Sequence, residues 1–224
     1  MMLNEIQIIK DAVFQRKTTD RPLINYWLYL FLLSWITFGI YPLILFFQRI
    51  GRIDKFIARK RIYYGAVIDY TETLARSTGG YESVAGEIQA LKDLFNMTYQ
   101  RKILPLNAGL SFFYVIITFG IWNWVICYRM NKIWDMLQSF EYAFDQQLSS
   151  LWQTLGLKTD GLTFNLVSAK KRNFALYLFL SFITLGIWGI VWDYKMHTDP
   201  DDLYPQFHQV EDHILHTMEN RSVA

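Results

Sequence analysis

Cysteine is almost absent from this 224-residue sequence, in which Cys127 is the single example. One cysteine excludes an internal disulfide and any cysteine-based metal cluster. The sequence also lacks phosphate-cradling glycine loops and the H-E-x-x-H motif of zinc hydrolases. The net charge of +2 supplies no dominant basic face, so we expect no nucleic-acid partner. We therefore identify no catalytic, cofactor-binding or metal-ligating residues and predict a protein without enzymatic activity.

All four histidines lie near the C-terminus. His208, Asp212 and His216 are spaced so that they share one face of a helix, a spacing that metal sites use. A solvated polar face opposite the apolar stripe of the same helix explains them more simply. Without a second cluster of ligands elsewhere in the chain, we predict no metal at this position.

Charge is missing from three long runs, which are residues 22–48, 103–128 and 173–192. Uncharged apolar runs of about 18 residues or more are candidates for membrane segments. All of the charged residues lie outside these runs, so the mild overall hydropathy averages two different environments. The sequence therefore predicts an integral membrane protein with a lipid bilayer as its first partner.

Each run contains one copy of the pattern I-T-[FL]-G-I-[YW], at residues 36–41, 117–122 and 183–188. Three copies in one chain indicate an internal repeat. Glycine permits backbone angles that other residues resist, and a threonine hydroxyl can bind a backbone carbonyl that a helix break leaves free. The structural residues of the motif are therefore Thr37, Gly39, Thr118, Gly120, Thr184 and Gly186.

Amphipathic helices are predicted between the runs, because apolar residues recur there at spacings of three and four. Strand signals are weak, and we predict an all-α fold. The predicted helices cover residues 49–76, 82–100, 129–156 and 200–219, the last starting at the Asp-Pro-Asp-Asp sequence of 199–202. The chain then divides into an N-terminal segment, 1–21, and three repeats, 22–102, 103–172 and 173–224. We also expect the helices around 50–74, 84–99 and 130–155 to pack into a bundle.

Two interpretations of the apolar runs remain open. Each run is long enough for a single kinked helix that spans the bilayer. Alternatively, each run is a re-entrant hairpin that turns at the motif and returns to the same side. Single spans would place 10 lysines and arginines on one side and 12 on the other, whereas cytoplasmic loops normally hold the excess. Re-entrant hairpins would place all of these flanks in the cytoplasm.

Basic and aromatic residues that follow the motif are suited to the membrane–water interface. The predicted interface anchors are Arg49, Tyr128, Arg129, Trp192, Tyr194 and Lys195. At these residues the sequence resembles the domain-of-unknown-function 4234 family of bacterial membrane proteins. The third copy, with the sequence L-G-I-W-G-I-V-W-D-Y-K from Leu185, is the most similar, while Pro42 and Asn123 depart from the pattern in the first and second. The resemblance implies a membrane location but no activity.

Our functional prediction is a membrane-embedded interaction or scaffolding protein without catalytic activity. We expect it in the cell inner (cytoplasmic) membrane, with a homo-oligomer or a protein partner at the cytoplasmic face. The alternative is a homo-oligomeric pore or membrane-perturbing effector, in which the repeats line or bend the bilayer. The substrate, the partner and the physiological role are not readable from the residues.

Overall fold

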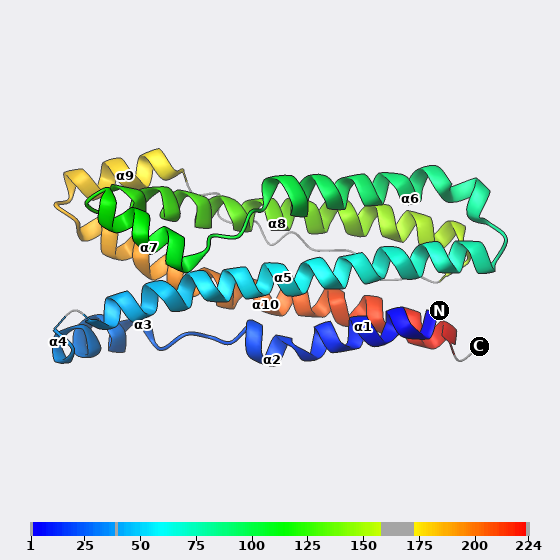
Figure 1. Ribbon diagram of the computed structural model, residues 1–224, viewed down its shortest axis with the longest axis horizontal. Helices are drawn as coiled ribbons and strands as arrows, with labels where there is room; N and C mark the ends of the chain where they lie inside the picture. The colour runs from blue at the N-terminus through cyan, green and yellow to red at the C-terminus, as the bar shows by residue number, and fades with distance from the viewer. Residues whose placement is uncertain (1, 39, 158–172, 223–224) are drawn as a thin grey trace.

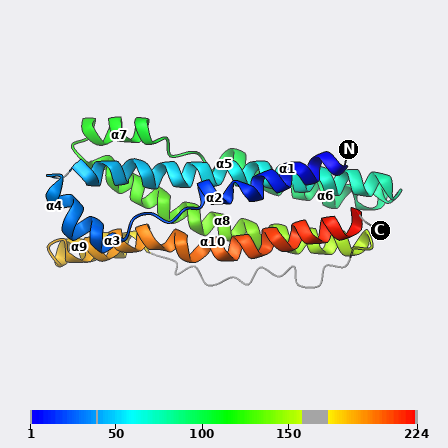
Figure 2. The same ribbon diagram turned by 90° about the horizontal axis from the view of Figure 1, so that it is seen from below.

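The computed structural model describes residues 2–38, 40–157 and 173–222. Within these residues the fold is all-α, as predicted, and contains no strand. Three long helices run side by side along an elongated molecule, namely α5 (Ile40–Ser77), α8 (Ile121–Thr154) and α10 (Ile187–Ser222) (Figures 1 and 2). Each has 34 to 38 residues and is therefore about 50–57 Å long.

Each long helix is preceded by a short antiparallel leg, and the two form a helical hairpin. The legs are α3 (Tyr26–Leu28) with η1 (Tyr29–Leu33) and α4 (Ser34–Ile36), then α7 (Ala108–Ile117), then α9 (Phe174–Ile183). All three hairpin turns lie at one end of the molecule, while both termini lie at the other end (Figure 1). Among the described helices, we found none that combines the length and the apolar character needed to cross a membrane.

The boundary that we predicted between each apolar run and its following helix does not exist. The second leg of every hairpin continues without a break into the amphipathic helix, so the predicted starts at 49 and 129 lie inside α5 and α8. Nothing at these positions ends a helix, because the sequence there has neither proline nor a helix-stopping pair of glycines. The change from apolar to charged residues is a change of environment along one continuous helix.

The predicted helix start at residues 199–202 is also wrong, because α10 passes through both Pro200 and Pro205. Each proline removes one hydrogen bond from the helix interior. Tertiary contacts hold this stretch in place: the Arg52 guanidinium donates to the His197 carbonyl oxygen (3.1 Å) and to the Asp201 carboxylate (2.7 Å). Packing therefore overrides the local signal.

The half of the molecule away from the hairpin turns is a helical bundle with one hydrophobic core. Helix α1 (Met2–Phe14), α2 (Arg16–Thr19) and α6 (Tyr81–Phe95), which continues as the π-helix η2 (Asn96–Lys102), complete it. The predicted packing of the three amphipathic stripes is confirmed. The ring centroids of Tyr64 and Phe144 are 4.7 Å apart, and the Trp152 indole donates to the Thr71 hydroxyl (3.0 Å). The predicted break between Ser77 and Tyr81 is confirmed as well.

Candidate functional site

The hairpin end is the part of the molecule with the most unusual local structure. Each first leg begins at an asparagine whose side-chain oxygen caps the helix by accepting backbone N–H groups. Asn107 and Asn173 lie 11 residues before the motif threonine, whereas Asn25 lies 12 residues before it. The π-helix η1 accommodates the additional residue, because its hydrogen bonds span five residues instead of four. The three legs therefore share one design despite the insertion.

The motif threonines close the turns in the same way in all three hairpins. The hydroxyl of Thr118 donates to the carbonyl of Tyr114 (2.7 Å) and accepts the N–H of Trp122 (2.9 Å). Thr37 and Thr184 make the equivalent pairs of bonds at 2.6–3.0 Å. Each threonine hydroxyl thus satisfies one N–H group of the second leg. The first-leg carbonyl that it binds is not left free, because it also accepts the threonine's own backbone N–H at 3.0–3.1 Å.

The glycines account for only part of the turn geometry. Gly120 and Gly186 have positive φ angles of 89° and 94°, while Gly39 lies outside the described residues. The residue before each glycine also has a positive φ, and it is not glycine: Phe38, Phe119 and Leu185 have values of 49–50°. A side chain in this left-handed conformation costs about 1–2 kcal/mol. Our sequence interpretation missed these residues because it attributed the whole turn to glycine.

These three side chains are almost completely exposed, at 96% for Phe38, 98% for Phe119 and 96% for Leu185. They make no contribution to the core, although they occupy positions that a glycine would fill without strain. Other large exposed apolar side chains surround them on the same legs. The most exposed are Phe31, Trp35, Ile36, Ile40, Ile121, Phe179, Phe182, Ile183 and Ile187. We call Phe38, Phe119 and Leu185 the tip residues.

Polar contacts tie the first and third hairpins together below the tips. Arg49 forms a bidentate ion pair with Asp193, and its guanidinium also lies 3.3 Å from His197 Nδ1. Burial and the neighbouring charge of Arg49 lower the pKa of His197 to about 4, so this ring is neutral at physiological pH. His197 Nε2 lies 2.7 Å from the carbonyl of Ile24. The Arg49–Asp193 ion pair and the contact between His197 and the Ile24 carbonyl therefore fix the position of the first hairpin relative to the third.

The predicted interface anchors have different surroundings. Tyr128 and Lys195 remain accessible. Arg129 donates to the carbonyls of Leu104 and Pro105, which lie just before α7, the first leg of the second hairpin. Tyr194 stacks on Trp27 of the first hairpin. Trp192 does not fit the expectation, because only 2% of it is exposed and its ring packs 5.7 Å from that of Trp124. Trp192 joins the second and third hairpins, because the indole that we placed at the surface faces the neighbouring helix.

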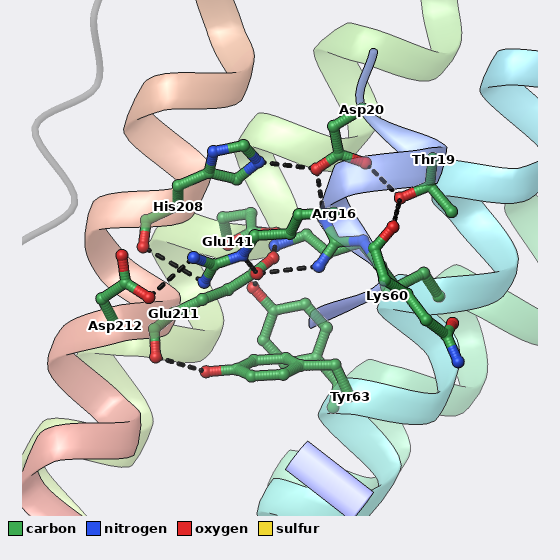
Figure 3. Close-up of polar contacts among 12 residues, drawn as sticks. Arg16, Thr19, Asp20, Lys60, Tyr63, Glu141, His208, Glu211 and Asp212 are labelled. Carbon is green, nitrogen blue, oxygen red and sulfur yellow. Dashed lines mark hydrogen bonds and ion pairs between the residues drawn. The ribbon is translucent and has the colours of Figure 1, made fainter. Parts of the chain in front are cut away.

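A second unusual cluster lies inside the bundle and was not predicted (Figure 3). Lys60 of α5 is fully buried and forms ion pairs with Glu141 of α8 (2.6 Å) and Glu211 of α10 (2.7 Å). Arg59 pairs with the same Glu211 and with Asp20 (both 2.8 Å). The signal was present in the sequence, since these charged residues occupy core positions of the apolar stripes.

Charge neighbours control the titration of this cluster. Burial alone would raise the pKa of Glu211, but the cations of Lys60, Arg59 and Arg16 hold it below its usual range. Asp145 has the opposite behaviour: burial and the charge of Glu141 raise its pKa well above the usual range. No described residue forms a hydrogen bond with its carboxyl oxygens. The cluster is therefore an ion network in which burial and the charge of Glu141 favour the protonated form of Asp145 by raising its pKa.

The histidine spacing noted in the sequence does not create a metal site. His208 Nε2 lies 2.6 Å from the Asp20 carboxylate, and Asp212 accepts a hydrogen bond from Arg16 (2.6 Å). Across the part of the chain that the structure describes, no three histidine, cysteine or carboxylate side chains are arranged to hold a metal ion.

The third hairpin is similar to a known protein family. Residues 172–217 match the family model described as Domain of unknown function (DUF4234). This match falls on the third repeat, which is therefore similar to the family. The DUF4234 match covers α9, the tip at Leu185 and most of α10, and it confirms the family predicted from the motif. No curated protein and no solved structure is significantly similar to the chain.

Proposed function

We propose that this protein is a non-catalytic membrane scaffold whose three hairpins enter one leaflet of a bilayer from the same side. The single observation that carries the proposal is the tip geometry. Three large apolar side chains are held in strained backbone conformations and are almost fully exposed at one end of the molecule. Local strain without a structural gain is expected at a functional position. Apolar lipid is the environment that would stabilise such side chains.

The dimensions of the hairpins support insertion into one leaflet. The legs α7 and α9 have ten residues each, which corresponds to about 15 Å of helix. This is half of the roughly 30 Å hydrocarbon core of a bilayer. The asparagine caps at the start of each leg would then lie at the headgroups, and the tips near the bilayer centre. These lengths favour the re-entrant interpretation over the spanning one.

The hydrogen bonding at the turns supports the same orientation. Unsatisfied backbone groups are costly in lipid, where no water can replace the missing partners. The threonine hydroxyls of the motif bind backbone groups of both legs. In addition, the N–H groups of Gly120 and Gly186 bind carbonyls of the first legs at 2.8 Å. A turn built in this way is suited to an apolar environment.

The bundle would extend from the membrane into water on the side that the hairpins enter. Because all basic flanks of the hairpins then lie on this side, the positive-inside rule favours the cytoplasmic face of the inner membrane. The bundle's polar surface would be the site of contact with a protein partner or a second copy of the chain. This arrangement is an anchor that holds a helical platform at the membrane.

Flotation with lipid vesicles tests the proposal, after reconstitution by detergent removal. We expect the wild-type protein to float with the vesicles and the triple variant Phe38→Asp, Phe119→Asp, Leu185→Asp to remain in the dense fraction. The matched control replaces Leu3, Phe14 and Ile62, which are exposed apolar residues of the bundle half, by aspartate. The control should float. Circular dichroism checks that each variant retains its helices.

Two outcomes would contradict the proposal. Flotation of the tip variant to the same extent as the wild type would show that the tips do not hold the protein at the membrane. Dye release from the vesicles that rises with protein density would favour the pore or membrane-perturbing alternative. The scaffold proposal predicts that the vesicles remain sealed.

A further inference from the structure

The basic residues of this protein fall into two groups that differ in their partners. In the half away from the tips, most of them form ion pairs within the protein. Lys10 pairs with Glu219 (2.6 Å), and both Arg76 and Lys92 pair with Glu72 (2.6 and 2.5 Å). Each of these cations therefore has a carboxylate partner within the protein.

Several basic side chains around the base of the hairpins form no ion pair with any residue that the structure describes, namely Arg101 and Lys102 at the end of η2 and five others that we group together. We call these residues the basic collar: Arg21, Lys55, Arg129, Lys132 and Lys195. They come from all three repeats. Arg21 precedes the first leg, Lys55 lies on α5, Arg129 and Lys132 lie on α8, and Lys195 lies on α10. Arg21, Lys55 and Lys132 are exposed, and the other two are half-buried.

The helical rise places the basic collar in a narrow range of distances from the tips. Lys195 lies eight residues after the start of α10 and Lys55 lies fifteen residues after the start of α5, which correspond to about 12 Å and about 22 Å. Arg21 lies near the level of Arg52, since its carbonyl accepts a hydrogen bond from that guanidinium (3.3 Å). In a leaflet entered by the tips, the headgroups begin about 15 Å from the bilayer centre and end at about 20–22 Å. The collar backbone therefore extends from about 3 Å below the headgroup layer, a gap that a lysine or arginine side chain can cross, to the outer edge of that layer.

Nearby carboxylates do not neutralise the basic collar. Asp193 and Asp201 are paired with Arg49 and Arg52, and Asp54 accepts the backbone N–H groups of Leu106 (2.7 Å) and Asn107 (3.0 Å). Hydrogen bonds from neutral N–H groups leave the charge of Asp54 in place, so Asp54, Asp135 and Asp202 reduce the charge of the collar from +5 to about +2. A ring of net positive charge remains at the base of the hairpins.

We propose that the basic collar binds anionic lipid headgroups, so that stable insertion of the hairpins requires a negatively charged leaflet. This inference rests on the proposed function and adds the class of lipid. The tips supply apolar attraction for any bilayer, whereas the collar supplies attraction only for a charged one. A basic residue near an anionic surface strengthens binding about fivefold, which corresponds to ~1 kcal/mol.

The test compares vesicles of phosphatidylcholine alone with vesicles that also contain phosphatidylglycerol. The variant replaces Arg21, Lys55 and Lys195 by glutamine, because none of these side chains holds another part of the fold. The matched control replaces Lys10, Arg76 and Lys92 by glutamine, which removes the same charge at the other end. We expect the wild type and the control to bind anionic vesicles much more strongly than neutral ones. The collar variant should lose on the order of a hundredfold in affinity for the anionic vesicles only.

The outcomes separate this inference from the proposed function. Equal binding of the wild type to neutral and anionic vesicles would show that the basic collar does not select anionic lipid, while leaving the proposal of tip insertion intact. Failure to bind either kind of vesicle would overturn the proposed function itself. The inference would also be contradicted if the collar variant bound anionic vesicles as strongly as the control variant. Displacement of the wild type from the vesicles by soluble glycerol phosphate would contradict it too, because that result would indicate a site for a single phosphate group. High salt should weaken binding to the anionic vesicles alone.

Discussion

Helices α7 and α8 end in the same hydrogen-bonded turn, but with opposite choices of residue. At the end of α8, Gly156 has a φ of 78°, and the N–H of Leu157 binds the carbonyl of Trp152 (2.8 Å). At the end of α7, Phe119 occupies the equivalent left-handed position, and the N–H of Gly120 binds the carbonyl of Val115 (2.8 Å). Glycine is the usual residue at this position because it has no Cβ.

The difference shows which end of the molecule is optimised for folding. The bundle half uses glycine where the backbone needs it and pairs its charges internally. The hairpin half accepts strain three times and exposes the side chains that cause it. If stability alone had determined the residue in both turns, glycine would occupy the left-handed position at the tips as well as at the end of α8. We therefore regard the bundle as the source of stability, and we propose that the tips are the functional part of the molecule.

Removal of Lys60 should give the largest effect on the bundle side of this comparison. Replacement of Lys60 by methionine leaves the buried carboxylates Glu141 and Glu211 without one of their cations. We expect the free energy of unfolding to fall by about 3–5 kcal/mol. Lys92→Met, which breaks a partly exposed pair, should cost less than about 1 kcal/mol. Denaturant unfolding measures both, and equal losses would show that the buried network has no special role.

The protonation of Asp145 should make the stability of the bundle depend on pH. Because burial and the Glu141 charge raise its pKa in the folded state, the folded protein retains a proton that the unfolded chain releases. Stability from this group is present at acidic pH and is lost as the pH rises from the ordinary carboxyl range towards the raised pKa. Asp145→Asn should remove this loss, whereas Asp135→Asn should retain it. Parallel pH profiles for the wild type and Asp145→Asn would contradict this assignment.

Exchange of residues between the two turns tests the comparison directly. Phe119→Gly relieves the left-handed strain and should stabilise the fold by roughly 1 kcal/mol. The same change should weaken vesicle binding by about tenfold or more, because one buried phenylalanine contributes ~1.5–3 kcal/mol. Gly156→Phe should lower stability by about 1–2 kcal/mol without affecting vesicle binding. If vesicle binding and stability changed in the same direction in both variants, the tips and the bundle would not have separate roles.

Loss of the motif hydroxyl should lower stability by an amount similar to that of Gly156→Phe. Thr118→Val removes a hydrogen bond to each leg of the second hairpin, and we expect a cost of about 1–2 kcal/mol. Thr154→Val is the control, because the Thr154 hydroxyl makes a single bond to the Ser150 carbonyl at the exposed end of α8. Loss of the Thr154 hydroxyl should cost clearly less. Thermal unfolding in vesicles or detergent compares the two variants. If Thr154→Val lowered stability more than Thr118→Val, the Thr118 hydroxyl would not be a main stabilising group of the turn.

Sequence patterns located the turns but not their strained residues. The repeated threonine and glycine identified where each hairpin reverses, because a hydroxyl and a missing Cβ have direct mechanical meanings. The left-handed backbone of Phe119 was not predictable, since phenylalanine rarely adopts it and no local pattern signals it. The confirmed all-α fold and bundle packing followed from apolar residues at helical spacing.

Other features depended on contacts that are distant in the sequence. Helix α10 continues through Pro200 because Arg52, far away in the chain, binds the backbone and side chains of this stretch. Trp192 is buried by Trp124 of another repeat. Lys60 and Glu211 interrupt apolar stripes, which indicates a buried pair only once both helices are known to be neighbours.

The depth of the three tips in a bilayer is the most direct test of the central claim. Spin labels would be placed at residues 38, 119 and 185 and, as a reference, at residue 77, each in a Cys127→Ser background. We predict that oxygen reaches the three tip labels and that a water-soluble nickel chelate does not, at depths close to the bilayer centre. The label at residue 77 should show the reverse. Tip labels that the chelate reaches as readily as the label at residue 77 would contradict the account.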